Sequence, residues 1–536
     1  MGKNLLFLCL LGYSLSGCNK PSSRNFNEIG FIDHQNLRYI ENEKLIRFQV
    51  GEIKKNLDEA EKLGIDSYLL FAKETMEAAL NYNFQVDGIG TIGALAFPED
   101  SEHRKIAKYL VPAFKEVIEY AKGKNIKIYI HSNQFIFPDE VLPIIKPAVW
   151  GTAICPGKPA TWEIYRKKIE EFINLFPGIA GLQITGDETQ VSVLECNCEN
   201  CRNIGFIERI NMLTTETANV CAKYGMEVQM RTWQRMGELG DPATMYDNVP
   251  GNVVFSLKNT DGDFHITNPF DTVFIGNRKP ERQIVEFDAW REYEGHNYFP
   301  CYLGDIWSPR FKKLKDLGVK RIAVRVNWNS NKNPIFECQW GNVVNIYTFL
   351  QLAKDPDKNP DVILKEFVAE NYPEKTRETA FEIYKQSTLF QESIFNFGGG
   401  YIAHHSRMLK DIEDIRSKLN DYQKSGKLLC REDFDSQRNV INSSFQIISQ
   451  LLDKIKNDAP VMAVGLSKGA QVEKLIALGI LDQMEYVFCQ QNNLKPGEEF
   501  ITKIKERSAQ WQNIDIVGFK DMRGDLLPAL INYSPN

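Results

Sequence analysis

The chain has 536 residues, of which 43% are hydrophobic and 25% charged, and its formal net charge is −6. These values are ordinary for a folded globular protein, and the length suits two or three domains or one large barrel with an appended domain. The acidic balance argues against nucleic-acid binding, which usually requires a basic face, so no nucleic-acid partner is expected.

Residues 1–17 have the pattern of an export signal. Lys3 is followed by the apolar run Leu5–Leu11, and Leu15-Ser16-Gly17-Cys18 ends the segment with small residues and a cysteine. This pattern resembles a bacterial lipobox, in which Cys18 is lipidated and becomes the mature N-terminus; a plain secretory signal is the alternative. We therefore expect a membrane partner through the lipid anchor. Because no acidic run follows Cys18, we expect an outer-membrane lipoprotein at the periplasmic face rather than the cell surface.

Residues 18–60 are expected to form a tether and a short N-terminal segment with one helical stretch around Lys54–Leu63. From about Ile65 to Trp328, short runs typical of β-strands alternate with longer helical patterns. One such pattern covers Trp162–Phe176, and another runs from Phe206 to the helix-stopping Gly225. The eight candidate strands are Ser67–Phe71, Ile126–His131, Ala148–Ile154, Ile179–Thr185, Glu227–Trp233, Asn252–Leu257, Gln283–Phe287 and Arg321–Asn327.

Eight strand–helix units match a (β/α)8 barrel in both count and length. A doubly wound open sheet is the competing fold, but no glycine-rich phosphate loop follows the first candidate strand. We therefore predict an α/β fold, a (β/α)8 TIM barrel, over residues 61–335. Residues 336–536 are predicted to form a C-terminal α-helical domain, through which a homodimer could form. Its helices are expected at Val362–Tyr372, Ser406–Tyr422, Phe434–Lys456 and Val472–Gln490.

Carboxylates follow three of the candidate strands: Glu188 after the fourth, Asp263 after the sixth and Glu292 after the seventh. The carboxyl ends of barrel strands face one pocket, where such groups can exchange protons with a substrate. Glycosidases use one carboxylic acid to protonate the leaving oxygen and a second carboxylate to activate water or to attack the sugar. A single acidic loop residue is usually a solvated charge, but three at the strand ends of one barrel indicate glycosidic bond hydrolysis.

Aromatic, amide and cationic side chains suited to sugar binding lie near the same strand ends. An aromatic ring at a barrel rim is as often a packing group as a sugar-stacking group, and lone histidines are commonly structural. The candidates for substrate contact are His131, Trp233, Lys258, Asn259, Tyr293 and Trp307.

Several motifs in order carry a resemblance to a known family. Lys258–Phe264, Glu286-Phe287 and Arg291–Gly295 resemble the signature of the family 67 α-glucuronidases. The match continues through Cys301–Gly304, Trp307 and Asn345–Asp357, and the resemblance covers roughly residues 180–390. It implies a catalytic barrel, an exo-acting hydrolase that inverts configuration, and an oligosaccharide or polysaccharide fragment as substrate. No cofactor is expected.

The resemblance also implies roles for individual residues. Glu188 matches the general acid, and Asp263 and Glu292 match the positions that supply the base. Arg231 matches an arginine that helps to hold the substrate carboxylate, although an ion pair with a neighbouring barrel acid is the alternative. The family has a lysine four residues before the acid, where this chain has Ile184. The substrate is therefore a neutral sugar, or an acidic sugar bound by another cation.

Cys196, Cys198 and Cys201 form a C-x-C-x2-C motif shortly after Glu188. Such a motif can hold zinc or an iron–sulfur cluster, while in an exported protein it can also form a disulfide staple. Because no fourth ligand with standard spacing lies nearby, no metal is expected. Excluding Cys9 and Cys18 from the 11 cysteines leaves an odd number, so at least one thiol should be unpaired.

Two other functions fit parts of the sequence. The first is a retaining glycosidase with Glu188 as acid/base and Glu292 as nucleophile, although that clan usually has asparagine where this chain has Asp187. The second is a non-catalytic, lipid-anchored sugar-binding protein, against which the three acids at strand ends argue.

Overall fold

The computed structural model describes residues 24–34, 42–71, 73–133, 137–150, 153–185, 196–232, 248–276, 279–327, 342–397, 400–402, 412–424, 429–494 and 498–512. The chain divides into two compact units. The first contains the residues up to Asp263 together with Pro269–Phe287 and Arg310–Asn329. The second contains Phe264–Asn268, Asp288–Pro309 and the residues from Ser330 onwards. Each unit is described by itself.

The first unit is a closed barrel of eight parallel strands, which confirms the predicted (β/α)8 fold. Each strand pairs with its neighbour around the ring, and the ring closes where the first strand pairs with the last. In chain order the strands are β1 (Glu28–Asp33), β2 (Ser67–Leu70), β5 (Lys127–Asn133), β8 (Gly181–Thr185), β9 (Glu227–Thr232), β10 (Val253–Lys258), β11 (Gln283–Asp288) and β12 (Arg321–Asn327).

Two strand predictions change. Glu28–Asp33, within residues 18–60 that were expected to form a tether and a short N-terminal segment, is the first barrel strand and pairs with both β2 and β12. Ala148–Ile154 is not a barrel strand: Val149–Trp150 (β6) and Ala153–Ile154 (β7) form a small antiparallel pair. The two errors offset one another, because the barrel strands from the fourth onwards keep their numbers. His131 moves to the third barrel strand, and Asp263 still follows the sixth.

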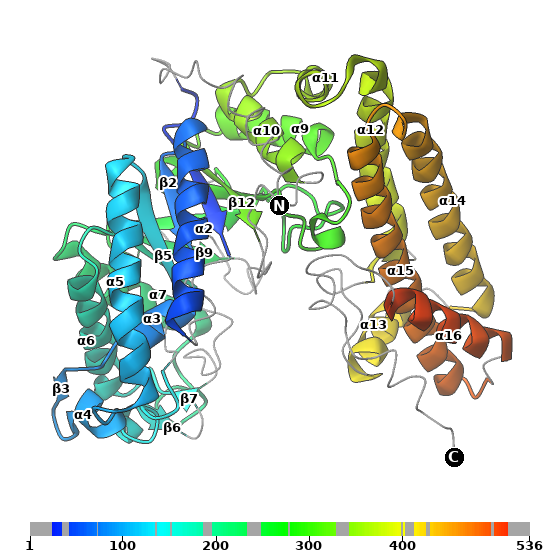
Figure 1. Ribbon diagram of the computed structural model, residues 1–536. Coiled ribbons are helices and arrows are strands. Elements are labelled where there is room, and N and C mark those ends of the chain that lie inside the picture. The colour runs from blue at the N-terminus through cyan, green and yellow to red at the C-terminus, as the bar shows by residue number, and fades with distance from the viewer. Residues whose placement is uncertain are drawn as a thin grey trace. The chain divides into compact units, whose positions relative to one another are not determined.

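Helices of the first unit lie alongside its strands (Figure 1). They are α2 (Glu43–Lys62), α3 (Lys73–Ala79), α4 (Ile92–Ala96), α5 (Glu102–Gly123), α6 (Pro159–Leu175), α7 (Phe206–Ala222) and the end of α9 (Gly304–Asp316). In α2 the buried residues Ile46, Val50, Ile53 and Leu57 recur at helical spacing and form the face that packs inward. The helix begins where the Asn42 side chain accepts a hydrogen bond from the Leu45 backbone N–H, at 2.9 Å.

The second unit is mainly helical, as predicted for the C-terminal region. Its helices are α10 (Asn342–Lys354), α11 (Pro360–Asn371), α12 (Arg377–Phe395), α13 (Ile412–Lys424), α14 (Arg431–Ile455), α15 (Pro460–Gln491) and α16 (Glu498–Gln512). Helices α12, α14 and α15 run side by side (Figure 1). Helix α15 is buried on all sides between Val472 and Cys489, so it forms the centre of this unit's core. No helix among the described residues combines the length and apolarity of a membrane span.

Candidate functional site

The barrel interior changes character along its axis. At the amino ends of the strands, Arg321 of β12 pairs with Glu28 of β1 at 3.0 Å and with Glu227 of β9 at 2.7 Å. A cluster of mainly apolar side chains from six strands fills the barrel, comprising Ile32, Leu69, Tyr129, Val254, Ile284 and Ala323. Polar and charged side chains line the interior towards the carboxyl ends, which is where barrel enzymes carry their active sites.

Gln183 of β8 lies at the centre of the polar part of the interior. Its side-chain oxygen lies 2.8 Å from Nδ1 of His131, and its amide nitrogen donates to the Ser256 hydroxyl and to Gln229, both at 3.3 Å. These partners lie on three different strands, so the Gln183 side chain points into the barrel. Adjacent strand residues point to opposite faces, and Ile184 therefore faces the surrounding helices. A lysine at position 184 would not reach the interior, so Ile184 does not exclude an acidic substrate.

Arg231 of β9 forms a buried ion pair with Glu286 of β11. Its Nε lies 3.0 and 2.9 Å from the two carboxylate oxygens, and the Ser256 hydroxyl donates to the same carboxylate at 2.6 Å. Burial would raise the pKa of Glu286, but the Arg231 charge and the Ser256 hydrogen bond hold it below its ordinary value. The ion pair proposed as the alternative role of Arg231 is thus present.

Lys258, at the end of β10, forms an ion pair with Asp263 in the loop that follows. Lys258 is 5% exposed, whereas the Asp263 side chain keeps 26% of its surface accessible. Burial lowers the pKa of Lys258, Asp263 opposes that shift, and the charges of Arg231 and Arg325 add to it. Three cations thus share the carboxyl end of the barrel. Sequence reasoning missed Arg325, although the alternation of Arg321, Ala323 and Arg325 along one face of β12 was a usable signal.

The turn that carries Asp263 is held by Asn259. The Asn259 side-chain amide donates to the backbone oxygen of Glu286 at 2.8 Å, and its side-chain oxygen accepts from Arg310. Gly262, with φ of +81°, adopts the left-handed conformation that the turn requires. These contacts give Asn259 a positioning role for Asp263; direct contact with substrate stays a prediction.

His131 is fully buried. Its ring stacks on Phe71 with centroids 3.6 Å apart, and Gln183 bonds to its Nδ1. Phe71 also stacks on His34 on its other side at 3.8 Å, so three rings form a stack at the ends of the first three barrel strands. The surroundings of His131 are those of a packing residue, and its predicted contact with substrate gains no support from them.

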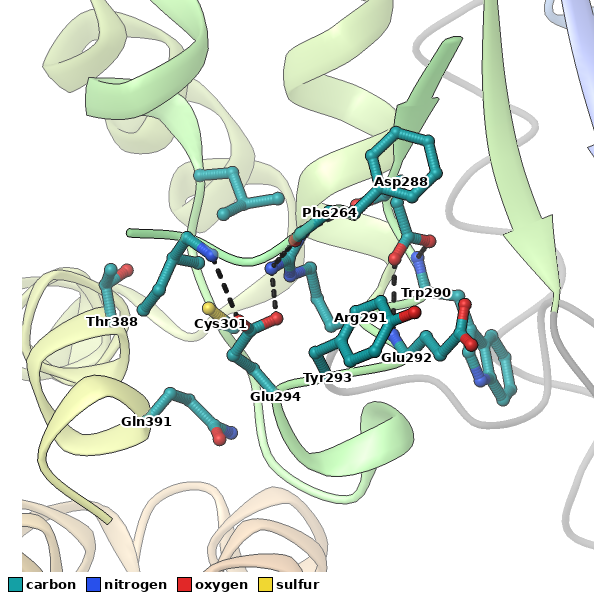
Figure 2. Close-up of polar contacts among 12 residues, drawn as sticks. Phe264, Asp288, Trp290, Arg291, Glu292, Tyr293, Glu294, Cys301, Thr388 and Gln391 are labelled. Atoms are coloured by element: carbon teal, nitrogen blue, oxygen red, sulfur yellow. Dashed lines mark hydrogen bonds and ion pairs between the residues drawn. The ribbon is translucent and has the colours of Figure 1, made fainter. Parts of the chain in front are cut away.

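Glu292 lies in the second unit, four residues beyond the end of β11. The segment around it is held by the side chains of Asp288 and Arg291 (Figure 2). The Asp288 carboxylate accepts from the backbone N–H groups of Trp290 and Glu292, at 3.1 and 3.2 Å. Arg291, with φ of +63°, pairs with Glu294 and donates to the Phe264 backbone oxygen at 2.7 Å. These contacts fix the backbone that carries Glu292.

The carboxylates of Glu292 and Glu294 lie on opposite sides of this segment (Figure 2). Burial raises the pKa of Glu294 to about 7, against the opposing charge of Arg291 and a hydrogen bond from the Ile266 backbone N–H at 3.1 Å. Glu292 itself is 3% exposed. The surroundings of Glu294 are therefore those of a residue that holds the second unit's own structure.

Tyr293 and Trp307, both predicted to contact substrate, are buried in the second unit. The Tyr293 ring packs edge-on against Tyr401 at 5.7 Å, and Trp307 packs edge-on against Phe349 at 6.2 Å. Their surroundings are those of core residues. Glu188, Trp233 and Cys18 lie outside the described residues.

The fold brings a fourth cysteine to the motif, although no ligand with standard spacing lies near the motif in the sequence. Cys155, in the loop before α6, lies against Cys198 and Cys201 although it is distant from them in sequence. Spacing rules that consider only neighbouring residues could not find it.

No protein-family model matches the chain, and no curated protein matches its sequence. Among solved structures, the chain is similar to a GH138 enzyme targeting pectin rhamnogalacturonan II, with a TM-score of 0.55 and 11% identity over 92% of this chain and 77% of that one. Another similar structure is a variant of the Thermobaculum terrenum O-GlcNAc hydrolase, with a TM-score of 0.44 and 11% identity over 95% of each chain. At this identity the first likeness shows a shared fold.

Proposed function

We propose that this protein is a glycoside hydrolase whose active centre lies at the carboxyl end of the barrel. The observation that carries the proposal is the ion pair of Lys258 with the accessible Asp263 at the end of the sixth strand. A carboxylate that a substrate can reach at the end of a barrel strand is the kind of group that acts as a general base or nucleophile. The fold shared with a GH138 enzyme supports the same class of reaction.

In the mechanism that we favour, Glu188 donates its proton to the leaving glycosidic oxygen while Asp263 removes a proton from the attacking water. Glu292 is the second candidate for the base, as the resemblance to family 67 α-glucuronidases implies. The water attacks the anomeric carbon from the face opposite the leaving group, so the product has inverted configuration.

We further propose that the substrate is an acidic sugar at the end of an oligosaccharide from a plant or other complex polysaccharide. The support is that three cations, Arg231, Lys258 and Arg325, lie at the carboxyl end with two paired carboxylates, Glu286 and Asp263, so that cations outnumber the carboxylates paired with them. A uronic carboxylate can pair with such a group in place of the lysine that the family has at the position of Ile184. A KM that rises at least tenfold when the uronic acid is esterified, with kcat little changed, would support this specificity.

The first test is a screen on aryl glycosides and uronic-acid oligosaccharides, followed by substitution of Asp263. Asp263→Asn should lower kcat by about 10²–10⁴-fold, because the amide cannot accept the proton. Asp261→Asn is the matched control, since Asp261 is exposed in the same turn and should tolerate the change. Glu188→Gln should abolish turnover while leaving ligand binding largely intact. Full activity in Asp263→Asn would remove Asp263 from the mechanism.

A proton NMR time course of the released sugar tests the stereochemistry. Inversion supports Glu188 as acid and Asp263 or Glu292 as base. A first product that keeps the substrate's configuration would instead favour a retaining mechanism with Glu292 as nucleophile. Binding without turnover of any glycoside would favour the sugar-binding alternative.

We propose that Cys18 carries a lipid and anchors the protein at the periplasmic face of the outer membrane. The lipobox-like Leu15-Ser16-Gly17-Cys18 supports this location. Metabolic labelling with a fatty acid should mark the wild-type protein but not Cys18→Ser, and protease treatment of intact cells should leave the protein uncut. Light scattering of the soluble chain tests the proposed homodimer.

A further inference from the structure

Four cysteines of the first unit converge on one point. The Cys155 sulfur lies 3.4 Å from the sulfurs of Cys198 and Cys201, and all four sulfurs, with that of Cys196, lie within 4.8 Å of one another. All four side chains are buried, with at most 7% of any residue exposed, and none of the four forms a disulfide. The cluster thus offers a closed set of four sulfur ligands.

The spacing of the sulfurs fits one metal ion better than the alternatives. Thiolates around tetrahedral Zn²⁺ lie about 2.3 Å from the ion and so about 3.8 Å from one another. Two disulfides would join the sulfurs in separate pairs at about 2.05 Å, whereas Cys155 is equally close to two partners. An iron–sulfur cluster places several irons and sulfides between its thiolates and would hold them further apart.

The surrounding residues hold the two loops in this arrangement. Arg209 of α7 donates to the backbone oxygens of Cys196 at 2.9 Å and Cys201 at 2.5 Å. The Thr161 hydroxyl of α6 donates to the backbone oxygen of Cys155 at 2.6 Å. A Cβ atom on Gly157 would lie 3.0 Å from the Asn200 Cβ atom and 3.2 Å from the Cys201 sulfur, so a side chain at this position would crowd the two loops where they meet.

We propose that Cys155, Cys196, Cys198 and Cys201 bind one structural Zn²⁺, which ties the loop after β5 to the loop after β8. Binding releases the thiol protons and forms four Zn–S bonds, so the site carries a net charge of about −2. The buried Arg209 guanidinium lies beside it and offsets part of that charge. Glu188 precedes Cys196 in the same βα connection, so the ion would fix one end of the segment that carries the candidate acid.

The test uses the purified protein and does not depend on activity. Metal analysis should find one zinc per chain, and zinc-edge X-ray absorption should find four sulfur ligands at about 2.3 Å. Replacement by Co²⁺ should produce the visible bands of a tetrahedral thiolate site. Cys155→Ser should lower the zinc content at least tenfold, whereas Cys221→Ser, which changes a buried cysteine of α7 outside the cluster, should keep it.

Three results would overturn the proposal. They are a wild-type protein with two disulfides in place of bound metal, one with the absorption of an iron centre, and a Cys155→Ser protein that keeps its zinc. If Cys155→Ser does not fold, as judged by circular dichroism, X-ray absorption on the wild-type protein still decides between four sulfur ligands and any other set.

Discussion

The carboxyl groups of this protein differ at the residue scale in what surrounds them. Asp263 is partly exposed and paired with a lysine, a setting that suits proton transfer to or from a ligand. Glu473 of α15 is fully buried and accepts hydrogen bonds from the Phe299 backbone N–H at 2.7 Å and from Gln391 at 2.5 Å. Burial raises the pKa of Glu473 well above its ordinary 4.5 despite those hydrogen bonds. Both side chains end in a carboxyl group, and only their surroundings give them different properties.

The raised pKa of Glu473 predicts how stability depends on pH. A group whose pKa is higher in the folded state stabilises the fold while it is protonated, so its contribution is complete below about pH 4.5 and is lost as pH rises. We expect the unfolding free energy of the wild-type protein to fall above that pH, by up to ~1.4 kcal/mol per pH unit for this proton. Glu473→Gln cannot ionise and should show a shallower fall.

Urea unfolding monitored by circular dichroism between pH 5 and pH 8 measures these slopes. Glu378→Gln, at an exposed position of α12, should keep the wild-type slope. Glu294 should leave a residual slope up to about pH 7 in every variant, since its pKa is raised to about 7. Parallel curves for the wild-type protein and Glu473→Gln would contradict the assignment.

At the scale of elements, the packing of α15 depends on how closely its backbone approaches a neighbouring segment. A Cβ atom on Gly469 would lie 1.8 Å from the backbone oxygen of Tyr298, so the helix touches the segment 288–309 through a bare glycine. By contrast, no atom lies within 4 Å of the place that a Cβ atom on Gly51 of α2 would occupy. Both glycines lie inside helices, but only at Gly469 does close packing require the absence of a side chain.

We therefore predict opposite signs for two identical substitutions. Gly51→Ala should stabilise the protein by about 0.5–1 kcal/mol, because alanine has the higher helix propensity. Gly469→Ala should destabilise it by about 1–3 kcal/mol or more, because the added methyl group forces backbone apart. Thermal and urea unfolding of the two variants measure both changes. An unchanged or raised stability of Gly469→Ala would show that α15 does not pack as described.

At the scale of the whole molecule, closure of the barrel depends on its first strand, β1. β1 lies between β2 and β12 and satisfies the backbone hydrogen bonds of both. Without it, two edge strands would be open to pairing with other chains. Helix α2, which follows β1, packs against α5 and covers part of the barrel.

A truncation test follows from this arrangement. A chain that begins at residue 24 keeps every barrel strand and should fold. A chain that begins at residue 61, the boundary suggested by sequence, lacks β1 and nearly all of α2. We expect the shorter chain to aggregate or to unfold without a cooperative transition. Soluble yield, light scattering and thermal unfolding compare the two, and cooperative unfolding of the shorter chain would contradict a closed ring as the stable unit.

The sequence by itself determined the features that depend on nearby residues. Local periodicity and the connections along the chain predicted the strand–helix alternation, the helices α11, α13, α14 and α15, and the positions of Asp263 and Glu292 after the sixth and seventh strands. The helices α10, α12 and α16 were not predicted. The strand Glu28–Asp33 was not predicted, because its role depends on pairing with Arg321–Asn327, almost three hundred residues away.

Only the tertiary structure decided which side chains meet. It paired Arg231 with Glu286, turned Ile184 away from the barrel interior, placed Arg325 beside Lys258 and brought Cys155 to the other three cysteines. Each of these contacts joins different strands or loops, and each depends on closure and register of the ring. The count of strand–helix units predicted a barrel, but short sequence patterns do not give the register of its strands or the side chains that meet, because these depend on pairing between distant strands.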